Sequence, residues 1–365
     1  MQIKLHEWAK KVVQTYKPIG KSTNVSYYTQ SDLTKIKESP DILVLGINPG
    51  SAGEYKELSA EEFLTGNPDF SERETEWHLW KRLRKILSIG GIDNLINDES
   101  RFVFSNVFHF GTLKDKDLTP DLKDEKLVGL TIEFIKTLKP TRVLCLGKSN
   151  CFKQLKIESI DLIQGELSYG KLDDIPIYGI PHTSSYYTNE ECVMIGKVLA
   201  ALFRDEIEPN AEIISIQFKD EIKAFEDRRD QLKPNNIRNY MVESAFDKYS
   251  HLQRWEIDNR WYYVTDDIVA RVASNGYVNI RHSDFNPNDN YSKHFDDNKY
   301  PYREELIECL KKYGYELTKN DLGTSLGHKP FNKYLDADKG PQYIVLSILQ
   351  EFEKLKMEFE SVFAK

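Results

Sequence analysis

The first 205 residues alternate short apolar runs with amphipathic segments. The clearest run is 42–45, four apolar residues that end abruptly at Gly46. Apolar runs bounded by Gly or Pro are typical of strands that are buried on both faces of a parallel sheet. The pattern predicts three further strands of this kind, at 101–107, 142–147 and 175–180.

Amphipathic helices are predicted between these strands. Residues 77–87 carry apolar side chains at helical spacing, and Gly90-Gly91 end the segment. Residues 127–138 and 190–203 show the same spacing. Alternation of strands and helices predicts a three-layer α/β/α domain with a mostly parallel central sheet.

The second part of the chain has a different pattern. A polar linker at 205–210 precedes an expected strand at 213–218 and an expected helix at 219–232. Asn275-Gly276 is a strong hairpin signal within an antiparallel meander. The meander is expected to consist of strands at 261–265, 268–273 and 277–281. A polar loop at 284–299 and helices at 304–313 and 343–363 are expected after it. We therefore predict two domains, 1–205 and a smaller α+β domain at 206–365.

Composition narrows the classes of protein that fit. A chain of 365 residues favours two domains, and its 40% hydrophobic and 30% charged residues are typical of soluble proteins. With no apolar run of membrane-spanning length and no signal-peptide core, we expect a cytoplasmic protein without a membrane partner. The four cysteines form no Cys-x-x-Cys pair, so we predict no metal, iron–sulfur cluster or other cofactor. The net charge of −8 disfavours indiscriminate nucleic-acid binding but permits a local basic face.

Polar residues follow three of the predicted parallel strands. Asn48 follows the first, Asn106 ends the second and His182 follows the fourth. Carboxyl ends of parallel strands meet at one edge of a sheet, where ligands bind. An Asn amide can pair with a pyrimidine edge, and a His can donate to an oxygen that becomes negative. Each residue alone also fits a turn, a strand-end cap or a surface histidine.

Four motifs at these positions resemble the uracil-DNA glycosylase superfamily, in the family's order, over roughly residues 40–205. Gly46-Ile47-Asn48-Pro49-Gly50 is similar to the first motif of the mismatch-specific branch. Phe104-Ser105-Asn106-Val107 resembles the strand motif in which an Asn reads the flipped base. Residues 139–148 resemble the Lys-Pro, apolar strand, Leu-Gly stretch of bacterial and archaeal members, and 181–186 the second catalytic motif.

The resemblance implies a uracil-DNA-glycosylase-like fold and hydrolysis of the bond between a flipped-out pyrimidine and its sugar in DNA, leaving an abasic site. Asn48 would position the attacking water, and His182 would donate to the departing base. Asn106 would read the Watson–Crick edge within a pocket formed by the first motif. The motifs that supply Asn48, Asn106 and His182 contain no lysine that could form a Schiff base with the sugar, so we expect a monofunctional enzyme.

Further side chains are candidates for contact with DNA or with the base. Ser184 would bind a phosphate beside the flipped nucleotide, and Tyr186 would insert into the space that the base leaves. The remaining DNA-contact candidates are Lys148, Ser185 and Tyr187. The candidates for stacking on the base are Phe63, Phe70 and Trp77, with Phe70 preferred. His109 either lines the pocket or is an ordinary loop histidine.

Two departures from the family pattern affect the expected substrate. Asn48 stands where the most efficient branch has Asp, and an amide cannot deprotonate water. Thr183 replaces the Pro that usually follows the motif His, which predicts a less rigid loop. We therefore expect a base that leaves easily: a deaminated or oxidised pyrimidine removed in repair, or a hypermodified cytosine excised from phage DNA in defence. The alternative is a catalytically silent nucleic-acid reader on the same fold.

Basic side chains occur in two places that could contact DNA. Residues 81–85 hold four of them on one predicted helix, which fits either a solvated face or phosphate contact. In the second domain, basic and aromatic residues alternate between 254 and 299, as in a nucleic-acid surface or in any half-buried meander. No obligate protein partner is inferred.

Overall fold

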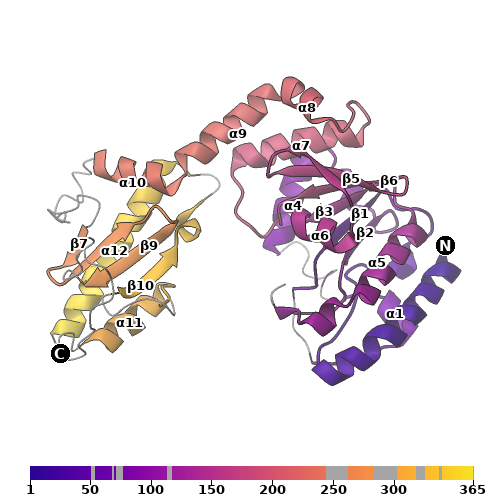
Figure 1. The fold of residues 1–365 in the computed structure, drawn as a ribbon, viewed down its shortest axis with the longest axis horizontal. Helices are drawn as coiled ribbons and strands as arrows, with labels where there is room; N and C mark the ends of the chain where they lie inside the picture. The colour runs from indigo at the N-terminus through magenta and orange to yellow at the C-terminus, as the bar shows by residue number, and fades with distance from the viewer. Residues whose placement is uncertain are drawn as a thin grey trace. The chain divides into compact units, whose positions relative to one another are not determined.

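The computed structural model describes residues 1–50, 54–67, 70, 77–112, 117–243, 262–282, 302–317, 325–336 and 339–364. The chain divides into two compact units, Met1–Lys223 and Ala224–Lys365. Each unit is described by itself below (Figure 1). The first unit extends past residue 205, where the sequence suggested a boundary, and includes the helix that follows the linker.

The first unit is built on a six-stranded sheet with the order β2-β1-β3-β6-β5-β4. Its four parallel strands confirm the sequence prediction: β1 (Ile42–Gly46), β2 (Phe102–Asn106), β3 (Val143–Leu146) and β6 (Ile175–Ile180). An antiparallel hairpin of β4 (Ser159–Ile163) and β5 (Leu167–Leu172) extends the sheet beyond β6. The sheet is therefore mixed and mostly parallel.

Helices flank this sheet. The helices are α1 (Gln2–Thr23), α2 (Ala60–Leu64), α4 (His78–Ile89), α5 (Glu125–Leu138), α6 (Lys148–Leu155), α7 (Asn189–Phe203) and α8 (Ala211–Gln217), with short 3-10 turns at Leu33–Lys35, Asp93–Ile96 and Pro120–Lys123. The predictions for α4, α5 and α7 are confirmed. The strand expected at 213–218 is wrong, because Asn210 caps α8 by accepting hydrogen bonds from the backbone N–H groups of Glu212 and Ile213.

Side chains of the parallel strands pack against helices on alternate faces. Leu43, Leu45 and Val103 share a core with α1 and α5, in which the Trp8 ring stacks 4.3 Å from that of Phe134. On the other face, Trp80 of α4 lies 5.4 Å from Phe102, and Phe203 of α7 lies 5.2 Å from Tyr178 (ring centroids). In Figure 1 the sheet accordingly lies between α7 and the pair α1 and α5. Burial on both faces explains why these strands are almost purely apolar.

The second unit contains an antiparallel sheet with the order β10-β9-β8-β7. Its strands are β7 (Tyr262–Thr265), β8 (Ile268–Val272), β9 (Tyr277–His282) and β10 (Ser325–Pro330). Its helices are α10 (Pro234–Glu243), α11 (Arg303–Lys312) and α12 (Pro341–Phe363), with a 3-10 turn at Phe331–Tyr334, and α9 (Lys219–Gln231) spans the junction. The predicted helices and meander are confirmed, whereas β10 was not predicted and the loop at 284–299 lies outside the described residues.

A helix must be both long and apolar to cross a bilayer. Among the helices that the structure describes, none is both long and apolar enough to cross a membrane. The longest of them, α12, spans Pro341–Phe363 and carries charged residues between its apolar ones.

Candidate active site

The parallel strands bring the three candidate polar residues to one edge of the sheet. Asn106 ends β2, and Asn48 follows the neighbouring strand β1. β3 and β6 come next in the sheet, and His182 lies just beyond β6. A Cβ added at Gly147, after β3, would lie 3.8 Å from the His182 Cβ, so His182 sits over the end of β3. The carboxyl edge thus presents Asn106, Asn48 and His182 in that order.

Asn48 is oriented by the loop that follows β2. Its amide Nδ2 donates to Thr112 Oγ1 at 2.8 Å, to the Thr112 carbonyl at 3.1 Å and to the Pro49 carbonyl at 3.0 Å. Carbonyl oxygens only accept hydrogen bonds, so these contacts fix which end of the amide is nitrogen. The Asn48 Oδ1 therefore faces away from Thr112, where it can accept a hydrogen bond from a water.

The first motif is held in place by pairing that continues past the two strands. The Gly46 and Ile47 carbonyls accept hydrogen bonds from the backbone N–H groups of Val107 and Phe108, each at 2.9 Å. Ile47 and Pro49 are buried and Gly50 is exposed. Gly46 has a steric role, because a Cβ there would lie 2.7 Å from the Asn106 Oδ1. Only glycine leaves room for the Asn106 side chain.

Asn106 is buried with an unsatisfied donor. Its side chain is 1% exposed, and its Nδ2 has no hydrogen-bond partner among the described residues. An unpaired buried amide costs about 1–3 kcal/mol, so native proteins seldom keep one without a use. A ligand with an acceptor on its edge would satisfy this donor.

The tautomer of His182 is set by the turn that follows it. The Ser184 backbone N–H donates to His182 Nδ1 at 3.2 Å, and Ser184 Oγ lies 2.6 Å from the same atom. A backbone N–H can only donate, so Nδ1 is an acceptor and the neutral ring carries its proton on Nε2. His182 is therefore arranged to donate from Nε2.

The turn containing His182 is supported from behind by residues that sequence reasoning did not identify. Thr183 is fully buried, and its carbonyl accepts a hydrogen bond of 3.0 Å from Arg82 Nη1 on α4. The Arg82 guanidinium also lies 5.5 Å from the ring centroid of Tyr187, whose hydroxyl donates to the Pro181 carbonyl. Tyr187 is fully buried and cannot insert into DNA, so its candidacy as a wedge is wrong.

Three other DNA-contact candidates differ in how accessible their side chains are. Ser185 is exposed and Tyr186 is half-buried, in the same turn as His182. The Lys148 side chain is only 12% exposed, and its ammonium lies 3.4 Å from the Asp161 carboxylate. A hydrogen bond from Ser168 and the nearby Lys148 lower the pKa of Asp161, so this pair is ionised. A DNA phosphate would have to compete with Asp161 for Lys148.

The stacking candidates lie in different places. Phe63 is 1% exposed in the core beneath the opposite face of the sheet, 5.7 Å from Trp8, so it is not available to a base. Phe70 packs 5.3 Å from Phe104 and 5.8 Å from Trp77. Phe104 points to the same sheet face as Asn106, two residues earlier in β2. Phe70 is itself only 4% exposed, and stacking on a base by Phe70 or Trp77 stays a prediction.

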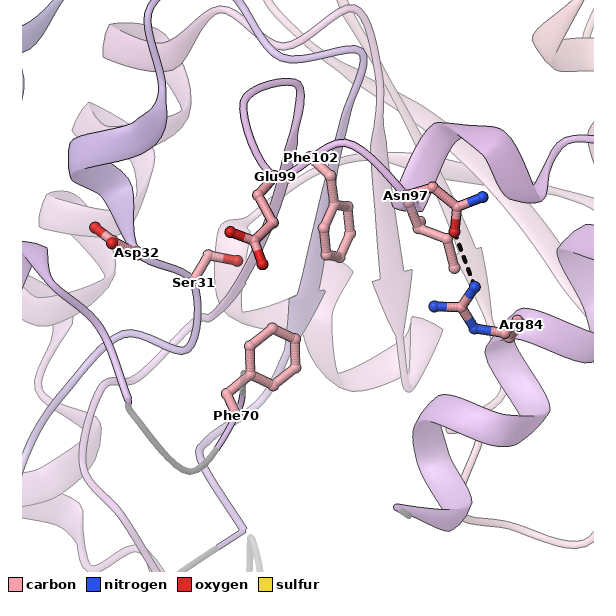
Figure 2. Close-up of a pocket in the computed structure, with 8 residues that line it drawn as sticks. Ser31, Asp32, Phe70, Arg84, Asn97, Glu99 and Phe102 are labelled. Atoms are coloured by element: carbon pink, nitrogen blue, oxygen red, sulfur yellow. Dashed lines mark hydrogen bonds between the residues drawn. The ribbon is translucent and has the colours of Figure 1, made fainter. Parts of the chain in front are cut away.

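Phe70 also lines a cavity of about 120 Å³ beside β2 (Figure 2). Figure 2 shows the Phe70 and Phe102 rings on two sides of it, with the Glu99 and Asp32 carboxylates nearby. Arg84 at its rim donates to Asn97 Oδ1 at 2.8 Å. Phe102 begins β2 whereas Asn106 ends it, so this cavity lies toward the opposite end of the strand from the candidate site.

His109 does not line the site, contrary to one of the two sequence interpretations. It is fully buried, with its ring 5.4 Å from both Tyr16 and Phe63 in the core beneath α1. Burial lowers the pKa of His109 to about 3, so the ring is neutral at physiological pH. His109 is a core residue.

No protein-family model and no curated protein matches this chain. Functional assignment therefore depends on the strand-end geometry and on the short motif resemblances. Within the described ranges, no group of three or more His, Cys, Asp or Glu side chains could hold a metal ion. The four cysteines are buried and unpaired by disulfides. The chemistry available at the edge is that of two amides, an imidazole and hydroxyls.

The basic residues considered for DNA contact are only partly described. On α4, Lys81 and Lys85 are exposed, whereas Arg82 and Arg84 are half-buried and bonded to other residues. In the second unit, Arg271 and Arg281 lie on β8 and β9, while the remaining basic candidates there are outside the described residues. DNA contact by either group stays a prediction.

Proposed function

We propose that the first unit is a monofunctional DNA glycosylase with a three-layer, uracil-DNA-glycosylase-like fold. It hydrolyses the N-glycosidic bond of a flipped-out damaged or modified pyrimidine and leaves an abasic site. The observation that carries the proposal is the buried, unpartnered Nδ2 of Asn106 at the sheet edge shared with Asn48 and His182. A pyrimidine carries acceptor atoms on its edge, and flipping delivers that edge to a pocket.

The oriented side chains have complementary roles in the reaction. As the bond from the sugar C1′ to the base breaks, its electron pair leaves with the base and positive charge develops on the sugar. The Nε2–H of His182 donates to the base oxygen that gains charge, and one such donor contributes about 2.7–4 kcal/mol in comparable oxyanion sites. The Oδ1 of Asn48 accepts a hydrogen bond from the water whose oxygen bonds to C1′.

The lack of a carboxylate at position 48 limits the substrate. An amide holds a water but does not take its proton, so that proton passes to solvent after the sugar cation has developed. Bond breaking is then assisted mainly at the base, which favours bases that are good leaving groups. Deaminated or oxidised pyrimidines and hypermodified cytosine both fit this requirement.

Excision can be tested on defined DNA. The full chain is incubated with duplexes that contain a single uracil, hydroxymethyluracil, G·T mismatch or modified cytosine, and is then treated with alkali. We expect cleavage only after alkali, since the enzyme leaves an abasic site. Asn48→Ala and His182→Ala should slow it about 100–1,000-fold, while Asn150→Ala, which removes an exposed amide from α6, should not. Intact strands for every base would refute the activity for those substrates.

Binding measured on the same duplexes separates an enzyme from a reader. A catalytically silent reader would bind a modified duplex with no excision for Asn48→Ala to remove. Mass spectrometry of free bases released from genomic DNAs of different modification identifies the substrate class. Plaque formation by phages with modified or unmodified cytosine then distinguishes defence from repair.

A further inference from the structure

Arg82 differs from the other basic residues of its helix in what it contacts. Lys81 is exposed, and Arg84 bonds to Asn97 at the rim of the cavity beside β2. Arg82 instead donates to the carbonyl of Thr183, one residue after His182, at 3.0 Å. Because Thr183 is fully buried, water cannot readily replace this bond.

Arg82 reaches the other side of the same turn through an aromatic ring. Its guanidinium packs over Tyr187, and the Tyr187 hydroxyl donates to the carbonyl of Pro181. Residues 181 and 183, on either side of His182, are thus both anchored to one side chain. A cation over an aromatic ring is attracted by the negative face of the ring, so this contact stabilises the anchor.

Two carboxyl groups lie near the Arg82 charge. Glu191 of α7 is 7% exposed, and its carboxylate accepts from the Thr188 backbone N–H at 3.3 Å. Burial and the neighbouring Glu166 raise the pKa of Glu191 to about 8, and the charge of Arg82 opposes that rise. At neutral pH the Glu191 carboxyl is therefore mostly protonated and does not neutralise the Arg82 charge.

We propose that Arg82 is a positioning residue for His182. By bonding to Thr183 and packing on Tyr187, it fixes the 181–187 turn so that the His182 Nε2 faces the strand-end site. Thr183 lacks the ring that would restrict a proline at this position, and the Arg82 hydrogen bond supplies the constraint instead. The catalytic consequence of this role rests on the proposed glycosylase function.

The kinetic test compares Arg82→Met with Lys81→Met, which removes the same charge from an exposed position of the same helix. We expect Arg82→Met to lower the single-turnover excision rate about 10–100-fold, as misplacement of a reacting group does. Affinity for DNA should stay within about twofold of the Lys81→Met value. Added to His182→Ala, Arg82→Met should cause little further loss, because both act through one side chain.

A different pattern would overturn the proposal. If Arg82→Met mainly weakens DNA binding and reduces its salt dependence by about one phosphate contact, Arg82 is a DNA ligand instead. Full additivity with His182→Ala would likewise show that Arg82 does not act through the imidazole.

A second readout needs no catalysis. Nitrogen NMR of the His182 ring, assigned by its loss in His182→Ala, should show the Nε2–H tautomer in the native chain and a mixture in Arg82→Met. An unchanged tautomer would refute positioning, whereas a changed tautomer in a protein that excises no base would refute only the glycosylase function. If Arg82→Met does not fold, Arg82→Lys and Tyr187→Phe test the same anchor, with smaller expected losses.

Discussion

One buried polar cluster of the second unit is satisfied internally, whereas the strand end of the first unit is not. In the second unit, Glu351 accepts hydrogen bonds from Tyr315 at 2.8 Å, from Lys329 at 2.6 Å and from Tyr334. The Lys329 ammonium also lies 4.4 Å from the Tyr334 ring centroid. At the strand ends, Asn106 keeps a buried donor without a partner among the described residues.

This difference separates structural from functional polarity. A buried network that is complete stabilises its surroundings and needs no ligand. An incomplete one costs stability and persists where a ligand completes it. The four-residue cluster around Glu351 is therefore part of the core of the second unit, and the strand-end residues are the candidates for a ligand site.

The largest expected effect is on the complete network. Glu351→Ala leaves the Lys329 ammonium buried without its partner, so we expect the second unit to lose about 3–5 kcal/mol in urea unfolding of the full chain. Glu360→Ala, on an exposed turn of the same helix, should cost less than about 0.5 kcal/mol. The double variant Lys329→Met/Glu351→Leu should recover much of the loss. Equal losses for Glu351→Ala and Glu360→Ala would remove the distinction between the two regions.

Removing the unpaired amide of Asn106 should have the opposite effect on the free energy of unfolding. Asn106→Leu removes the unpaired donor at similar volume, so we expect unfolding free energy to be unchanged or to rise by about 1 kcal/mol. Single-turnover excision should fall about 100-fold, because the base then leaves its own acceptor unpaired. A marked loss of stability would show that Asn106 has a structural partner and would break the comparison.

The sequence predicted the elements whose pattern is local. Parallel strands such as β1 and β2 are apolar on both faces and are bounded by Gly or polar residues, so they could be placed within one or two residues. The β4–β5 hairpin was not predicted, because three residues of β4 are exposed and show no run of buried apolar positions: Ser159, Ile160 and Asp161. Strand-end residues were predictable because parallel strands finish at one edge of the sheet.

Side-chain direction outside regular elements was not predictable. His109 follows Asn106 by three residues but points into the core, and no periodicity in that loop indicates which way it turns. Nothing in the sequence distinguishes Arg82, which anchors the His182 turn, from Arg84 on the same helix. The Tyr315–Glu351 bond joins residues 36 positions apart, beyond the reach of any local pattern.

His109 extends the comparison to pH. Its pKa is about 3 in the folded chain and 6.5 in the unfolded one. Between pH 3 and pH 6.5 the imidazole is therefore protonated in the unfolded state and neutral in the folded state. Stability is therefore lost as pH falls below 6.5, by about 2 kcal/mol at pH 5. His109→Phe should remove this dependence, measured as the difference in unfolding free energy between pH 7 and pH 5. An identical slope in the variant would contradict the assignment of His109 to the core.

The last effect concerns Glu191, whose buried carboxyl group lies beside the less buried Glu166 and so stands between the two kinds of region. Its folded pKa of about 8 exceeds the ordinary value of 4.5, so the native state binds more protons between them and stability falls as pH rises through that range. E191Q keeps the N3 side chain of the capping box and should remove this dependence, so its stability relative to the native chain should rise between pH 5 and pH 8.

The charged and titratable groups that interact with Glu191 are Glu166, Arg82 and Tyr187. Because Glu166 is the largest of them, E166Q should flatten the same pH dependence while leaving the capping box intact. Thermal melts of both variants from pH 5 to pH 9 measure this directly. A native-like slope in E166Q would mean that burial alone holds the proton on Glu191, and that the carboxyl pair plays no part in supporting Arg82 behind His182.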